Sequence, residues 1–108
     1  MSNQDQPVAS LADLPKPGAM RVVERDGQEI LLCRSGDNVY AVENLCTHAA
    51  ARLCEGRVRG DRVFCPLHGA AFDIRSGEAL SKPATVALQC FDVKVRDGEV
   101  YLVDNRED

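Results

Sequence analysis

Short apolar runs separated by turn residues follow one another along most of the chain. Residues 19–25 and 30–33 flank Asp26-Gly27, and an Asp-Gly between two apolar runs is a strong hairpin signal. Residues 30–33 are apolar throughout, as expected of a strand covered on both faces. Apolar and polar residues alternate over 91–96, before Asp97-Gly98 and a last apolar run. No segment keeps helical spacing for more than one turn, so the pattern predicts an all-β chain.

The region from about residue 44 to 84 differs from the two ends of the chain. It has fewer large apolar residues, and its turn residues predict a short hairpin from 57–58 to 62–64 around Gly60-Asp61. We therefore expect an antiparallel β-sandwich built from both chain ends, with a small subdomain inserted over 44–84. The insertion is too short to bury a core of its own, so we expect residues 1–108 to form one domain.

Composition and charge narrow the function classes. The chain has 108 residues, of which 44% are hydrophobic and 28% charged, and its net charge is −4. No basic stripe suggests a nucleic-acid partner, and no apolar run approaches the ~20 residues of a membrane-spanning helix. The polar N-terminus lacks the order of a signal peptide, so we expect a cytoplasmic protein. In that compartment, five cysteines indicate metal ligands or reduced thiols.

Both histidines and two of the cysteines lie in two short motifs, Cys46-Thr47-His48 and Cys65-Pro66-Leu67-His68. In extended chain, residues two apart point to the same side, so Cys46 and His48 can face one centre. Pro66 and the following glycine favour a tight turn in the second motif. A thiolate and an imidazole from each of two loops is the ligand pattern of a Rieske-type 2Fe-2S centre, with two thiolates on one iron and two imidazoles on the other.

The sequence also allows two other metal assignments. A structural zinc site also uses two cysteines and two histidines, but it usually takes the cysteines as one pair and the histidines as another. Here each motif mixes the two types. Cys54, which is close to the first motif in sequence, is a further possible ligand, although no standard four-cysteine cluster spacing emerges with it. A 2Fe-2S cluster on Cys46, His48, Cys65 and His68 is the favoured hypothesis.

The two motifs resemble the cluster-binding boxes of the Rieske family. The likeness continues through Glu55-Gly56, Phe72-Asp73, Ser76-Gly77, Lys82-Pro83-Ala84 and the closing hairpin over 91–103. The chain is most similar to the small Rieske ferredoxins of multicomponent aromatic-ring-hydroxylating dioxygenases. This resemblance implies an electron carrier rather than an enzyme. It would hold one cluster and carry single electrons from an NAD(P)H-dependent ferredoxin reductase to a terminal oxygenase. The alternative is a Rieske-like small subunit held in a stable reductase complex, as in nitrite reductase.

The sequence also departs from other branches of that family. Rieske proteins of respiratory and photosynthetic complexes have a disulfide that braces the cluster, whereas the matching positions here are Ala51 and Leu67. Those proteins also place serine and tyrosine hydroxyls where this chain has Ala70 and Phe72. Fewer hydrogen bonds to the cluster imply a low reduction potential, on the order of −150 mV.

The resemblance also indicates where partners dock. The histidine-ligated iron lies nearest the surface in such proteins, so electrons are expected to enter and leave the cluster through His48 and His68. Leu67 and Pro83 are expected to lie beside them and touch the partner. We expect a monomer that binds the reductase and the oxygenase in turn.

Overall fold

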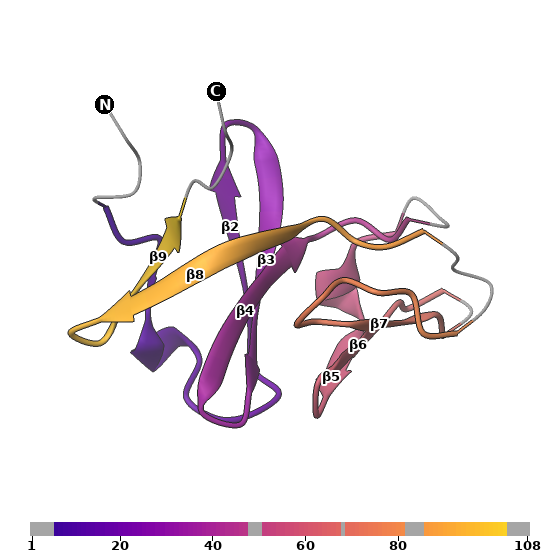
Figure 1. Cartoon of the computed structure of the whole chain (residues 1–108), viewed down its shortest axis with the longest axis horizontal. Helices are drawn as coiled ribbons and strands as arrows, with labels where there is room; N and C mark the ends of the chain where they lie inside the picture. The colour runs from indigo at the N-terminus through magenta and orange to yellow at the C-terminus, as the bar shows by residue number, and fades with distance from the viewer. Residues whose placement is uncertain (1–5, 48–50, 68, 82–85, 104–108) are drawn as a thin grey trace.

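The computed structural model describes residues 6–47, 51–67, 69–81 and 86–103 of the chain (Figure 1). The regular structure in these ranges is β-strand with two 3₁₀ turns, which confirms the all-β prediction. Its elements are β1 (Ala9–Ser10), η2 (Leu11–Asp13), β2 (Met20–Arg25), β3 (Gln28–Ser35), β4 (Asn38–Glu43), η3 (Leu53–Glu55), β5 (Arg57–Arg59), β6 (Arg62–Phe64), β7 (Ala71–Asp73), β8 (Cys90–Arg96) and β9 (Glu99–Val103). No helix among the described residues has the length and apolar character that a membrane crossing needs.

The larger sheet is antiparallel, in the order β1-β9-β8-β4-β3-β2. Its hairpins β2–β3 and β8–β9 turn at the two predicted dipeptides, Asp26-Gly27 and Asp97-Gly98. All four of these turn residues have positive φ, between 54° and 82°. Two-residue hairpin loops of type I′ require positive φ at both positions, and Asp-Gly adopts it readily.

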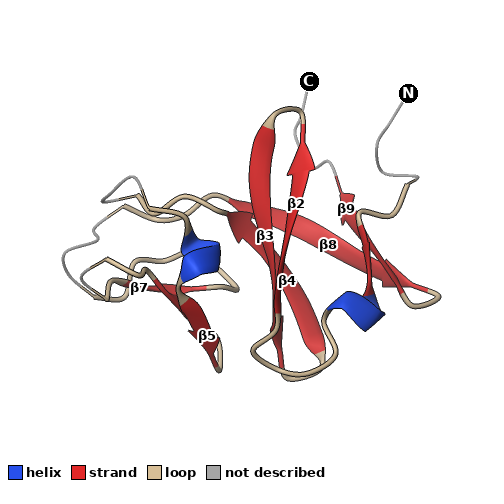
Figure 2. Ribbon diagram, turned by 180° about the vertical axis from the view of Figure 1, so that it is seen from behind, coloured by secondary structure: helices blue, strands red, loops and turns tan. Residues whose placement is uncertain are grey.

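The larger sheet folds over itself into two layers. β4 and β8 pair through two residue pairs, Ala41↔Phe91 and Val42↔Cys90, and β8 then runs across β2, β3 and β4. Figures 1 and 2 show this crossing from opposite sides. One core joins the two layers, and its buried members are Leu14, Ile30, Leu32, Val39, Ala41, Val100 and Leu102. This arrangement is the predicted antiparallel sandwich.

The smaller sheet has the order β5-β6-β7 and turns at the predicted Gly60-Asp61. It lies beside the larger sheet (Figure 1) and shares a second core with it. Strand β3 contributes to both cores, because Ile30 and Leu32 face one of them while Leu31 and Cys33 face the other. The continuous apolar run in β3 is therefore explained by burial on both faces. The limits of the inserted subdomain, and a single domain over 1–108, stay predictions.

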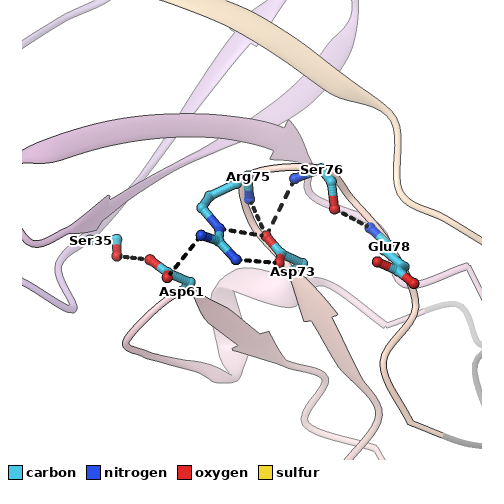
Figure 3. A network of polar contacts seen from close by, with 6 residues as sticks. All are labelled: Ser35, Asp61, Asp73, Arg75, Ser76 and Glu78. Carbon is cyan, nitrogen blue, oxygen red and sulfur yellow. Dashed lines mark hydrogen bonds and ion pairs between the residues drawn. The ribbon is translucent and has the colours of Figure 1, made fainter.

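A polar network ties the end of β3 to the smaller sheet (Figure 3). Ser35, buried at the end of β3, donates a hydrogen bond from Oγ to Asp61 in the β5–β6 turn. Arg75 pairs with Asp61 at 3.4 Å and with Asp73 at 2.9 Å. Asp73 also accepts the backbone N–H of Arg75 at 2.7 Å, which fixes the turn after β7. We refer to Ser35, Asp61, Asp73 and Arg75 as the Asp61–Arg75 network.

The Asp61–Arg75 network is expected to contribute to the stability of the fold in a pH-dependent way. Hydrogen bonds from the Arg75 side chain hold the pKa of Asp73 below its usual value. A carboxylate with a lowered pKa stabilises the fold above its unfolded-state pKa of about 3.9, and this stabilisation is lost as the pH falls through the folded pKa. Asp73→Asn should therefore lower the Tm at pH 7 by about 4–8 °C. The difference from the wild type should shrink in thermal scans from pH 7 toward pH 3. The exposed substitution Glu78→Gln is the control and should shift the Tm far less.

Candidate metal centre

Two loops carry the predicted cysteine ligands, and both are closed in the same way. The backbone N–H of Cys46 donates to the carbonyl of Ala51 at 2.9 Å, and that of Cys65 donates to the carbonyl of Ala70 at 2.7 Å. In each loop the acceptor lies five residues after the cysteine. Each predicted ligand cysteine is therefore fixed at the base of a closed loop.

The structure brings the two cysteines together. Cys46 and Cys65 are 3% and 2% exposed and belong to the same core. Burial raises the pKa of the Cys65 thiol, the backbone N–H of Leu67 opposes this, and the adjacent Cys46 thiol raises that pKa further. The two sulfur atoms thus face one another in a site shielded from water.

This donor set fits a resident metal group. Two buried thiolates in contact repel each other and lack hydration, so a cation between them is needed to hold both deprotonated. Iron and zinc both bind thiolates. The backbone N–H of Leu67 also points at the Cys65 sulfur, with a nitrogen–sulfur distance of 3.4 Å. Such N–H donors stabilise sulfur ligands of iron–sulfur clusters.

The predicted histidine ligands, His48 and His68, lie outside the described residues. Their neighbours are described: Thr47 follows Cys46, and its hydroxyl donates to the carbonyl of Val86 at 2.6 Å. This contact joins the first ligand loop to the segment that leads into β8. The assignment of both histidines as ligands stays a prediction.

The remaining cysteines occupy other environments. Cys33 is wholly buried inside β3, where burial raises the pKa of its thiol to about 12. Cys90 begins β8, and burial raises the pKa of its thiol as well. The sulfur of Cys54, in η3, accepts a hydrogen bond from Asn44 Nδ2 at 3.3 Å. These contacts with Asn44 give no reason to add Cys54 to the predicted ligands.

Three exposed apolar residues lie in or next to the loops of the predicted cysteine ligands. Among the described residues, the large apolar side chains that are exposed are Leu45, Leu67, Leu80, Val86 and Val95. Leu45 and Leu67 are 51% and 46% exposed and directly adjoin the two ligand loops, and Val86 contacts the first loop through Thr47. Pro83, predicted to lie with Leu67, is outside the described residues. The exposure of Leu45 and Val86 could not be predicted, because a single apolar residue in a loop sequence carries no signal of exposure.

Ala70 and Phe72, the two positions linked to the reduction potential, are wholly buried in the core that contains both ligand cysteines. Neither side chain carries a hydroxyl group. The environment of the cysteine pair is accordingly apolar at both positions, as the sequence indicated.

Comparison with known proteins identifies relatives of this arrangement. The family model described as the Rieske 2Fe-2S domain matches residues 4–92. Ferredoxin CarAc of Metapseudomonas resinovorans is 43% identical over 101 residues, covering 93% of this chain and 94% of the relative. The ferredoxin component of biphenyl 2,3-dioxygenase from Rhodococcus jostii (strain RHA1) is 40% identical, covering 90% and 89%.

Among solved structures, the chain is also similar to the ferredoxin of a dioxygenase system. The chain matches one from a complex of reduced oxygenase and oxidised ferredoxin in carbazole 1,9a-dioxygenase, with a TM-score of 0.84, 43% identity and 90% coverage of each chain. A putative small subunit of NADPH nitrite reductase matches with a TM-score of 0.77 and 24% identity. That second likeness supports the fold alone.

Proposed function

The chain belongs to the Rieske 2Fe-2S family and binds one cluster of that type, and from this premise we propose that it is the ferredoxin of an aromatic-ring-hydroxylating dioxygenase system. It carries electrons from a ferredoxin reductase to a terminal oxygenase and is not itself an enzyme. The observation that carries this proposal is the buried Cys46–Cys65 pair on two matched loops. High identity to dioxygenase ferredoxins over nearly the whole chain supports the choice of system.

The proposed ligands are Cys46 and Cys65 on the inner iron and His48 and His68 on the outer iron. When bound, the cluster supplies a centre that gains and loses one electron. The chain contributes two buried thiolates, the N–H of Leu67 directed at a ligand sulfur, and an apolar wall that includes Phe72. A zinc site, which the sequence also allowed, does not agree with membership of this family.

We place the partner-binding surface around the two ligand loops, at His48, His68, Leu67 and Pro83. The exposed Leu45 and Val86 extend this apolar surface. An oxygenase is its proposed occupant, because a related ferredoxin forms a complex with one. A carrier has to release both partners, so the interface is small and its affinity modest. We further propose that the protein acts as a monomer in the cytoplasm and uses the same surface for the reductase.

Electron transfer to an oxygenase tests the function and the surface together. The protein is reduced with dithionite without oxygen and mixed in a stopped-flow instrument with the oxidised oxygenase of the carbazole, naphthalene or biphenyl system. The wild type should reduce at least one of them, with a rate that rises with concentration. Leu67→Glu should lower the second-order rate constant by about tenfold or more, because a charge then replaces an apolar contact at the interface. Its visible spectrum should stay unchanged.

Val95→Glu is the matched control, since Val95 is 44% exposed but lies on β8 outside the ligand loops. This variant should transfer electrons at the wild-type rate. If none of the three oxygenases accepts electrons, the dioxygenase role is wrong. If Leu67→Glu and Val95→Glu both behave like the wild type, the role stands and the docking surface has to be sought on another face.

A further inference from the structure

The first ligand loop is held by its two limbs. Residues 44–46 enter the loop and residues 51–54 leave it, and the limbs pair through a bridge between Leu45 and Arg52 beside the Cys46–Ala51 hydrogen bond. The position of Cys46 therefore depends on how firmly these limbs are held to each other and to the larger sheet. Two side chains, Asn44 on the entering limb and Arg52 on the leaving limb, make these holding contacts.

Asn44, on the entering limb, is 2% exposed and its side chain is hydrogen-bonded on both sides. Its Nδ2 donates to Glu29 Oε1 at 3.0 Å and to Cys54 Sγ at 3.3 Å. Its Oδ1 accepts the backbone N–H of Cys54 at 2.8 Å. The Asn44 backbone also donates to the Glu29 carbonyl at 3.2 Å. Asn44 thus joins the two limbs to each other and to β3.

Arg52, on the leaving limb, binds the same carboxylate. Its Nε donates to Glu29 Oε1 at 3.0 Å and its Nη2 donates to Glu29 Oε2 at 2.9 Å. Hydrogen bonds from Arg52, and then from Asn44, hold the pKa of Glu29 below its usual value. A bidentate contact of this kind fixes the relative orientation of the two side chains, which a single exposed ion pair does not.

These contacts converge on one carboxylate near the start of β3. The Glu29 side chain binds Asn44, two residues before Cys46, and Arg52, one residue after Ala51. Ala51 is the hydrogen-bond partner of Cys46. The pairing of β3 with β2 and β4 is made by the backbone. Removing the charge of Glu29 therefore leaves the sheet intact while releasing the loop.

We propose that Glu29, Asn44 and Arg52 form a clamp that positions Cys46 and so controls how tightly the cluster is held. They are positioning residues, because they act through the loop backbone and not by contact with the metal group. The inference rests on the proposed ligand role of Cys46. It adds residues that the two cysteine–histidine motifs do not include, and it is independent of which oxygenase is the partner.

The test uses the cluster-loaded protein and the variants Glu29→Gln and Arg52→Lys. Glu29→Gln keeps an acceptor for Asn44 but removes the carboxylate, and Arg52→Lys keeps the charge but removes the fork of two donors. Iron release to a chelator is measured as the loss of visible absorbance. It should be about ten- to one-hundredfold faster in Glu29→Gln than in the wild type. Arg52→Lys should lie between Glu29→Gln and the wild type. The reduced variants should also show shifted or broadened electron paramagnetic resonance lines, which a purely structural role would not produce.

Arg75→Gln is the matched control. Arg75 and Asp61 form an ion pair with side-chain exposures of 54% and 43%, close to the 49% and 42% of Arg52 and Glu29, but away from the first ligand loop. The clamp is supported if Glu29→Gln releases iron faster than Arg75→Gln at an equal loss of Tm. The clamp is overturned if iron release and resonance lines of Glu29→Gln match those of the wild type. It is also overturned if Glu29→Gln and Arg75→Gln both release iron in proportion to their loss of Tm. The wild-type spectrum separately checks that a cluster is bound.

Discussion

Replacing Cys65 by serine is expected to abolish cluster binding. The wild-type protein should be red-brown and contain about two irons and two sulfides per chain. Cys65 is one of two buried thiols that face each other, and its sulfur also receives the N–H of Leu67. A serine hydroxyl is a far poorer ligand for iron than a thiolate, and it stays protonated in a buried site. Iron analysis, sulfide analysis and the visible spectrum should all fall close to the level of the protein without metal.

Cys54→Ser is the control for that experiment. The hydroxyl can still accept the hydrogen bond of Asn44 Nδ2, and the variant should keep its iron and its colour. This comparison also examines the Cys54 alternative raised by the sequence. Loss of the cluster in Cys54→Ser but not in Cys65→Ser would show that the ligand set has been assigned to the wrong thiol.

The strands and the cysteine pair could be predicted because their signals are local. Asp26-Gly27 and Asp97-Gly98 specify tight hairpins, and the structure places both turns there. The apolar run over 30–33 indicated burial on both faces, and β3 has one core on each side. Spacing within the two cysteine–histidine motifs indicated a common centre, and Cys46 and Cys65 do meet.

The supports of the site could not be predicted, because their partners are far apart in sequence. Glu29 and Arg52 look like ordinary surface charges until folding of β3 and the first loop brings them within 3.0 Å. Ser35 and Asp61 are joined in the same way across the two sheets. A sequence pattern of period two assigns a residue to a face of a strand, but it does not identify the side chain it will meet.

Gly56→Ala is expected to cause a large loss of stability and to disturb the second ligand loop. Gly56 follows η3 and lies against β6, where a Cβ atom would be 1.8 Å from the Phe64 carbonyl oxygen and 3.3 Å from that of Leu53. Both obstacles are backbone atoms, so no side-chain rotation relieves the clash. Phe64 immediately precedes Cys65, a proposed ligand, and displacing the Phe64 carbonyl moves the base of that loop.

Overpacking of this kind costs about 1–3 kcal/mol or more, and at about 4–8 °C per kcal/mol the Tm should fall by about 4 °C to more than 20 °C in a chain of this size. Thermal unfolding followed by circular dichroism measures this change, and iron analysis should show incomplete cluster loading. Gly60→Ala is the control: Gly60 has φ of 59°, but a Cβ atom there would meet nothing within 4 Å. That variant carries only backbone strain, on the order of 1 kcal/mol, and should load its cluster fully. Equal effects of the two substitutions would contradict the claim that close contact with Phe64, rather than glycine flexibility, makes Gly56 necessary beside the metal site.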